Sequence, residues 1–106
     1  MKSITAKMIP TDYTVGGQLM SIEHVERIEN GDLGRCSVAA GRILIAQNFD
    51  KHAQSETSKT NTFYHELVHS ILGTMGEREL SGNEKFVCSF SSFLMEALTT
   101  AEYKEE

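Results

Sequence analysis

The chain contains no tryptophan, a single proline and only two cysteines among its 106 residues. No apolar run approaches the ~18–20 residues that a membrane-spanning helix needs. The residues before Pro10 include Lys2 and Lys7 and hold no apolar stretch of secretory length. Cys36 and Cys88 have neither CxxC spacing nor the density of a disulfide scaffold. These absences argue against export and against a membrane protein, and they predict a cytoplasmic location.

Basic side chains are also scarce, with 10 Lys and Arg against 15 Asp and Glu, so that the net charge is −5. The excess lies mostly in residues 77–106, which carry seven Glu and three basic residues. Because a negative field repels phosphate, we do not expect nucleic acid as a partner. The length and the 40% hydrophobic content predict one domain, 1–106, with a modest core. The oligomeric state stays open.

The first half of the chain has the pattern of short strands interrupted by turn residues. Residues 4–9 alternate apolar and polar, and residues 13–15 form a short partner that ends at two glycines. Residues 19–29 fit either a short helix or a strand. Residues 35–46 predict a β-hairpin with Gly41 at the turn.

The second half changes to helical spacing. We expect a first helix from Thr62 that ends at Gly73 and Gly76, after a polar stretch at 50–60 that is loop or a frayed helix start. A second helix is expected from about Asn83 to Thr99. It has a broad apolar stripe that we expect to be buried, made of Phe86, Val87, Phe90, Phe93, Leu94, Ala97 and Leu98.

Together these elements predict an α+β fold. In it a small antiparallel sheet, built from the N-terminal strands and the hairpin at about 35–46, packs on the first helix and on a second, C-terminal helix.

The first helix carries an H-E-x-x-H motif, from His65 to His69. Four residues are one helical turn, so the two imidazoles lie side by side and can each direct a nitrogen at one metal ion. Glu66 lies about 100° around the helix, where it can take a proton from a metal-bound water as that water attacks a carbonyl. Chance placement of these residue types produces the motif in roughly 2% of shuffled chains. The alternative is two unliganded histidines beside a solvated glutamate.

A catalytic zinc needs a third protein ligand. No His and no Asp follows His69, which also excludes the longer metzincin pattern. The donors that remain downstream are Glu77, Glu79, Glu84, Cys88 and Glu96. Glu84 is the best of them, because it opens the second helix after glycines have turned the chain back. The alternative is a capping box in which Glu84 reaches back to the backbone of Ser81.

The remaining candidate donors have simpler interpretations. Cys88 lies four residues after Glu84, and if both bound the metal the site would be a closed, structural His–His–Glu–Cys centre. As a default we expect both Cys36 and Cys88 to be small buried hydrophobes. His24 and His52 are expected to be solvated, and Tyr64 is expected to pack rather than to act at the site.

The run from Thr62 to Leu72, followed by Asn83-Glu84-Lys85-Phe86-Val87, resembles the small zincin-like metallopeptidases of phages and mobile elements, of the ImmA/IrrE type. The Asn83-Glu84 pair is also similar to that of gluzincins such as thermolysin. The resemblance covers about 62–98, and upstream it rests on the hairpin at 35–46.

Carried over residue by residue, the resemblance implies that His65, His69 and Glu84 bind zinc and that Glu66 is the general base. It also implies a twisted sheet on the motif helix, with an edge strand at 42–46 beside the cleft, to which an extended peptide could pair by β-augmentation. No Tyr or His stands in an obvious position to stabilise the oxyanion.

The leading hypothesis is therefore a zinc-dependent metallopeptidase, in the cytoplasm of a bacterium or of a phage-infected host, that hydrolyses a peptide bond in a protein substrate. An alternative is a non-catalytic protein-binding module on a peptidase-like scaffold, with a structural zinc that Cys88 helps to hold. A third hypothesis is an inhibitor whose acidic C-terminal end binds a basic partner.

Overall fold

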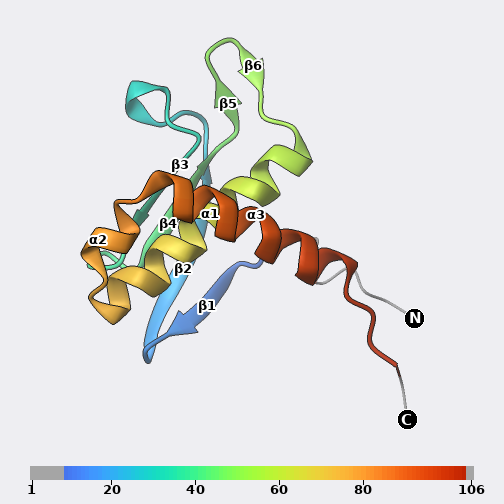
Figure 1. The fold of residues 1–106 in the computed structure, drawn as a ribbon. Helices are drawn as coiled ribbons and strands as arrows, with labels where there is room; N and C mark the ends of the chain where they lie inside the picture. Colours follow the sequence, from blue (N-terminus) through green and yellow to red (C-terminus); the bar gives the residue numbers. More distant parts are fainter. Residues whose placement is uncertain (1–8, 105–106) are drawn as a thin grey trace.

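The computed structural model describes residues 9–104 and has an α+β fold, as the sequence predicts. A four-stranded sheet is formed by β1 (Asp12–Val15), β2 (Gln18–Val25), β3 (Gly34–Ser37) and β4 (Arg42–Ala46). A second small sheet pairs β5 (Asn48–Phe49) with β6 (His52–Ala53). The helices are α1 (Glu56–Met75), α2 (Arg78–Ser81) and α3 (Glu84–Thr100). Both long helices lie on one face of the sheet (Figure 1).

The sheet is mixed, with strand order β1-β2-β4-β3, and not wholly antiparallel as expected. β1 pairs with β2 and β3 with β4 in antiparallel fashion, but β2 and β4 run parallel. The cause is the connection after β2, which passes through a 3-10 turn, η2 (Glu29–Gly31), and carries the chain to the outer edge. The hairpin then brings β4 back between β3 and β2. The edge strand on this side of the sheet, opposite β1, is therefore β3, and the expected edge at 42–46 is wrong.

The expected hairpin is confirmed, with Gly41 at φ +69° and its N–H donating to Val38 O at 3.0 Å. The ambiguous segment 19–29 is largely strand, because β2 is paired on both sides and buries Met20 completely. The strand expected at 4–9 falls, except for Ile9, outside the described residues.

Helix α1 begins six residues earlier than its apolar spacing indicates. Ser55 is its N-cap, and the Ser55 hydroxyl accepts a hydrogen bond from Ser58 N at 3.1 Å. The first turns carry few apolar side chains, so periodicity could not find them. Its C-terminal end is as expected, because Gly76 adopts φ +81° as the C-cap. The short helix α2, in the connection to α3, was not predicted.

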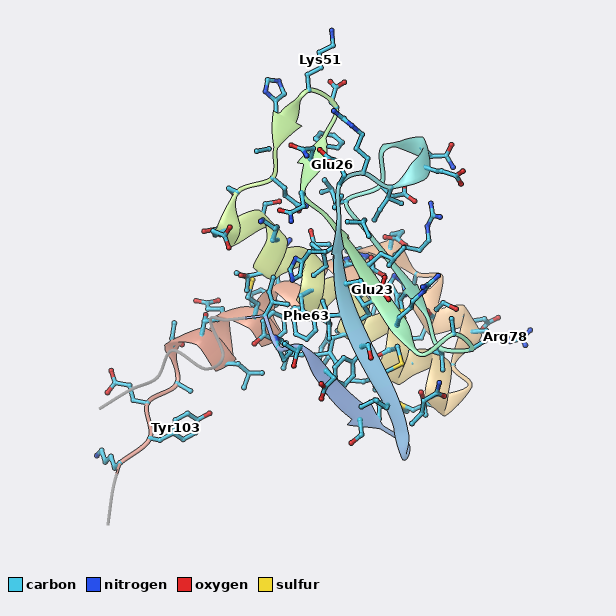
Figure 2. The ribbon with its side chains drawn as sticks, turned by 180° about the vertical axis from the view of Figure 1, so that it is seen from behind. Glu23, Glu26, Lys51, Phe63, Arg78 and Tyr103 are labelled. Carbon is cyan, nitrogen blue, oxygen red and sulfur yellow. The ribbon has the colours of Figure 1, made fainter. Side chains whose placement is uncertain are left out.

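The core lies between the sheet and α1. Met20, Ile43 and Ile45 from the strands pack with Phe63 and Tyr64 of α1, which confirms the expectation that Tyr64 packs. A second cluster, of Val68, Leu72 and Val87, joins α1 to α3. Figure 2 shows the sheet in front of the helices, with Phe63 behind the strands. These two clusters set the position of α1 between the edge strand and α3.

The expected burial of the α3 stripe is wrong for much of its width. Of its apolar residues only Val87 is fully buried, whereas Phe90 and Phe93 are 46% and 69% exposed. Helix α3 packs mainly on α1, with a smaller contact to the short helix α2, and these neighbours cover only one part of so broad a stripe. The other part faces away from the described core.

Candidate metal centre

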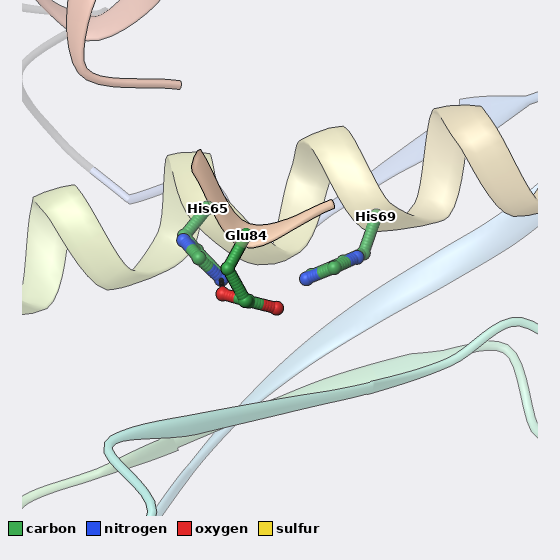
Figure 3. A group of neighbouring side chains, drawn as sticks. All are labelled: His65, His69 and Glu84. Carbon is green, nitrogen blue, oxygen red and sulfur yellow. Dashed lines mark ion pairs between the residues drawn. The ribbon is translucent and has the colours of Figure 1, made fainter. Parts of the chain in front are cut away.

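The two histidines of the motif lie on one face of α1, as the spacing predicts (Figure 3). Their ring centroids are 4.9 Å apart and both side chains are partly buried. The second core cluster holds this face of α1 toward α3.

Glu84, at the start of helix α3, lies beside these two histidines. Its Oε1 lies 3.9 Å from Nε2 of His65, and one donor atom from each of His65, His69 and Glu84 lies within 4.8 Å of the others. Two imidazole nitrogens and one carboxylate oxygen are a donor set that catalytic zinc sites use. The three residues are therefore close enough to bind a metal ion.

The capping box considered for Glu84 is absent. The N-cap of α3 is Asn83, whose Oδ1 accepts from Phe86 N at 3.0 Å. Glu84 is thus the first residue of α3, and its carboxylate is directed toward the histidines (Figure 3). Ser81, the residue that the capping box required, belongs to α2 and is bonded elsewhere.

Each histidine of the motif has a neighbour at its Nδ1 atom. Nδ1 of His69 lies 2.9 Å from Ser81 Oγ, with which it forms a hydrogen bond. On the other ring, Nδ1 of His65 lies 4.0 Å from Cys88 Sγ. A partner on Nδ1 fixes the orientation of an imidazole and leaves Nε2 free to bind a metal. This role of Ser81 was not predicted, because nothing in the local sequence pattern relates α2 to α1.

Cys88 is exposed, and the expectation that it is a buried hydrophobe is wrong. Its Sγ lies 3.9 Å from Glu84 Oε1, but it faces Nδ1 of His65, whereas Glu84 faces Nε2. Cys88 is not one of the three convergent donors. Cys36 is only partly buried, and burial together with the nearby Glu66 raises the pKa of its thiol to about 11.

Glu66 lies beneath the edge strand and is only 8% exposed. Burial, helped by the negative charges of Asp32 and Glu84, raises the pKa of its carboxyl group to about 7, although Arg35 acts in the opposite direction. Burial and the neighbouring His65 lower the pKa of His69, which favours the neutral imidazole that metals bind. The site thus combines a histidine whose pKa is lowered with a carboxyl group whose pKa is raised to about 7.

A pocket of about 260 Å³ opens beside these residues. Its lining joins the start of the edge strand to α1 and consists of Asp32, Leu33, Gly34, Asn61, Thr62, His65 and Glu66. The first five of these residues were not predicted as site residues, because no local pattern indicates that the start of β3 lies beside this part of α1.

Gly34 allows this close approach of strand and helix. A Cβ atom at residue 34 would overlap Cγ2 of Thr62 and would lie 3.3 Å from Oε2 of Glu66. Thr62 cannot easily turn away, because its hydroxyl donates to Gln54 Oε1 at 2.7 Å. In the sequence, the one indication of this close approach is a glycine at the point where a loop becomes a strand.

The other candidate donors lie apart from the site. Glu77 caps α2, Glu79 lies within α2, and both are exposed. Glu96 is three turns further along α3 than Glu84. His24 and His52 are exposed, as expected. Within residues 9–104, the His65–His69–Glu84 group is the one set of donors close enough to hold a metal ion.

No protein-family model, no curated protein and no solved structure matches this chain. The resemblance to zincin-like metallopeptidases therefore stays a prediction from the motif residues. None of the helices in the described part of the chain combines the length and the apolar character needed to cross a membrane.

We predict that Ser81→Ala weakens zinc binding about 10- to 100-fold, because the ring of His69 loses the group that orients it. The matched control is Ser92→Ala, which alters an exposed serine more than two turns beyond Glu84 on α3. Competition with a chromophoric chelator measures both affinities. Equal affinities for Ser81→Ala and the unaltered chain would show that this hydrogen bond does not position His69.

We also predict that Gly34→Ala lowers the free energy of unfolding by about 1–3 kcal/mol, because the new methyl group overlaps Thr62. Thr62→Ser removes the overlapping methyl group and keeps the hydroxyl that bonds Gln54. The double variant should therefore recover more than half of the loss. Urea unfolding of the three variants measures this, and a strictly additive double variant would contradict the proposed overlap.

Proposed function

We propose that this chain is a cytoplasmic zinc-dependent metallopeptidase that hydrolyses a peptide bond in a protein or peptide substrate. The observation that carries the proposal is the convergence of His65, His69 and Glu84 beside a buried Glu66. Both cysteines are free thiols, which supports a reducing compartment.

Zinc held by these three residues would supply a Lewis acid that polarises the substrate carbonyl and makes a coordinated water acidic. The chain itself supplies the base. Glu66 accepts a proton from the attacking water as its oxygen bonds to the carbonyl carbon. It then donates that proton to the amide nitrogen as the C–N bond breaks. A pKa near 7 suits a group that must both accept and donate a proton at neutral pH.

The edge strand supports a binding mode for an extended peptide. β3 pairs with β4 on one side only, so its other side offers backbone groups for β-augmentation. The pocket begins where β3 begins, at Gly34, and its lining includes Glu66. A peptide aligned along β3 would therefore pass the base. Asn61, an exposed residue in the pocket lining one helical turn before His65, supplies an amide that can donate to the carbonyl oxygen.

A second candidate is a non-catalytic binding module in which zinc joins α1 to α3. The observation in its favour is the position of Cys88, whose sulfur lies 4.0 Å from Nδ1 of His65 and 3.9 Å from Oε1 of Glu84. A small reorientation of these side chains would add a fourth protein ligand and close the site. The two candidates differ in whether zinc binding depends on Cys88.

The first experiment is elemental analysis of the purified chain and of three variants. We expect about one zinc per chain, lost in His65→Ala and in Glu84→Ala but kept in Cys88→Ser, because an open site needs three protein ligands. Loss of zinc in Cys88→Ser would favour the binding module. A chain free of zinc after metal-replete, reducing purification would refute both candidates.

Glu66→Gln tests the chemistry separately from the metal. The amide keeps the size of the side chain but cannot accept a proton, so we expect normal zinc content and at least ~100-fold slower cleavage. The substrate probe is a peptide library prepared from a bacterial proteome, with new termini identified by mass spectrometry. Glu79→Gln, an exposed glutamate on α2, is the control. Cleavage that survives Glu66→Gln would disprove the role of this base.

A further inference from the structure

Helix α3 has a second apolar face, of which Phe86 alone packs against a core cluster, that of Val68, Leu72 and Val87. Phe86, Phe90, Phe93 and Ala97 lie within an arc of about 60°, because each residue turns the helix by about 100°. Phe90 and Phe93 are 46% and 69% exposed. The rings of Phe86 and Phe90 stack at 5.5 Å with an interplanar angle of 8°. We call these four residues the phenylalanine face.

The phenylalanine face is separate from the metal centre. Glu84 and Cys88 lie roughly 160° away from it around α3. The core-facing side of the helix, with Val87, lies between them on one side. Figure 1 shows α3 on the outside of α1, with its last turns extending beyond the sheet. An exposed stripe of aromatic residues on a helix is typical of a protein interaction surface.

The flank of the phenylalanine face that lies opposite Val87 is polar, and we call it the polar border. It carries one charge of each sign. Lys85 and Glu96 are eleven residues apart, which places them within about 20° of each other around the helix. Both are exposed, and neither has an ion pair among the described residues. Their midpoint along α3 lies beside Phe90, close to the centre of the phenylalanine face. Along the axis of α3, the phenylalanine face and the pair of border charges therefore have nearly the same centre.

We propose that a second copy of this chain covers the phenylalanine face, with the two α3 helices antiparallel about a two-fold axis near residues 90–92. In this register Phe90 lies opposite the partner's Phe93, and Phe86 lies opposite the partner's Ala97. A large side chain thus meets a small one at each end, and aromatic rings meet at the centre. The surface is complementary to itself, as a two-fold interface requires.

The charges select this orientation. In an antiparallel two-fold pair each border meets the same border of the partner, so Lys85 lies beside the partner's Glu96 and Glu96 beside the partner's Lys85. A parallel pair would bring the polar border against the core-facing side of the other helix and leave both charges unpaired. One helix from each copy buries less than the ~1,200–2,000 Å² of a standard interface, so we expect association in the micromolar range.

Sedimentation of the full chain over roughly 1–200 µM tests the proposal, with zinc and with a chelator in parallel. We expect a monomer–dimer equilibrium that does not depend on zinc, since no metal ligand belongs to the phenylalanine face. A monomer at every concentration would overturn the proposal. So would a dimer that the chelator abolishes, because that dimer would be joined by metal.

Phe93→Glu locates the interface. The side chain is largely exposed, so the variant should fold normally and weaken dimerisation at least about 30-fold. The matched control is Phe49→Glu, which alters a phenylalanine on β5 that is 45% exposed. Equal effects of the two substitutions, or none from Phe93→Glu, would place the interface elsewhere.

Charge reversal tests the antiparallel register. Lys85→Glu and Glu96→Lys should each weaken self-association roughly tenfold, because each creates two like-charged pairs in the dimer. The double variant should recover the original affinity to within about threefold. A mixture of the two single variants should form a heterodimer more tightly than either associates alone. Failure of both the double variant and the mixture to recover association would overturn this register.

Discussion

The candidate metal centre depends on the packing of α3 against α1. Two histidines one turn apart on a helix are only two ligands, and the third must come from a segment that the chain brings back from elsewhere. The contact of Val68 and Leu72 with Val87 provides that return, because it fixes the start of α3 beside the turn that carries the histidines. Asn83, as the helix cap, then leaves Glu84 directed at His65 rather than at the backbone.

Glu66 depends on a different contact, that of the edge strand β3 with α1, which buries its side chain. A carboxyl group that is 8% exposed is costly to ionise, and its raised pKa is the expression of that cost. The edge strand can cover it only because residue 34 has no side chain. The burial that raises the pKa of this carboxyl group therefore requires close contact between β3 and α1. This explains why the pocket is formed at that junction.

The parts of the structure that the sequence predicted are those with a local signal. The motif helix, the hairpin around Gly41 and the choice of Glu84 all follow from spacing and turn residues within short segments. The parallel pairing of β2 with β4, and hence the identity of the edge strand, depends on where a connection crosses the sheet. No local pattern carries that information. The Ser81–His69 bond was missed for the same reason, because it joins two helices across a turn.

The apolar pattern of α3 shows the limit of periodicity most clearly. The sequence contained one broad stripe, and in the structure it divides into two adjacent faces. One face, which includes Val87 and Leu94, contacts α1, whereas Phe93 is 69% exposed. Periodicity measures how apolar a face is, but not whether the same chain has anything to place against it. In a chain of 106 residues only a modest core is possible. Two phenylalanines that stay 46% and 69% exposed are therefore a substantial loss of apolar burial for this fold. The partner that we propose for this face is a second copy, because an antiparallel two-fold pair places Lys85 of each copy beside Glu96 of the other.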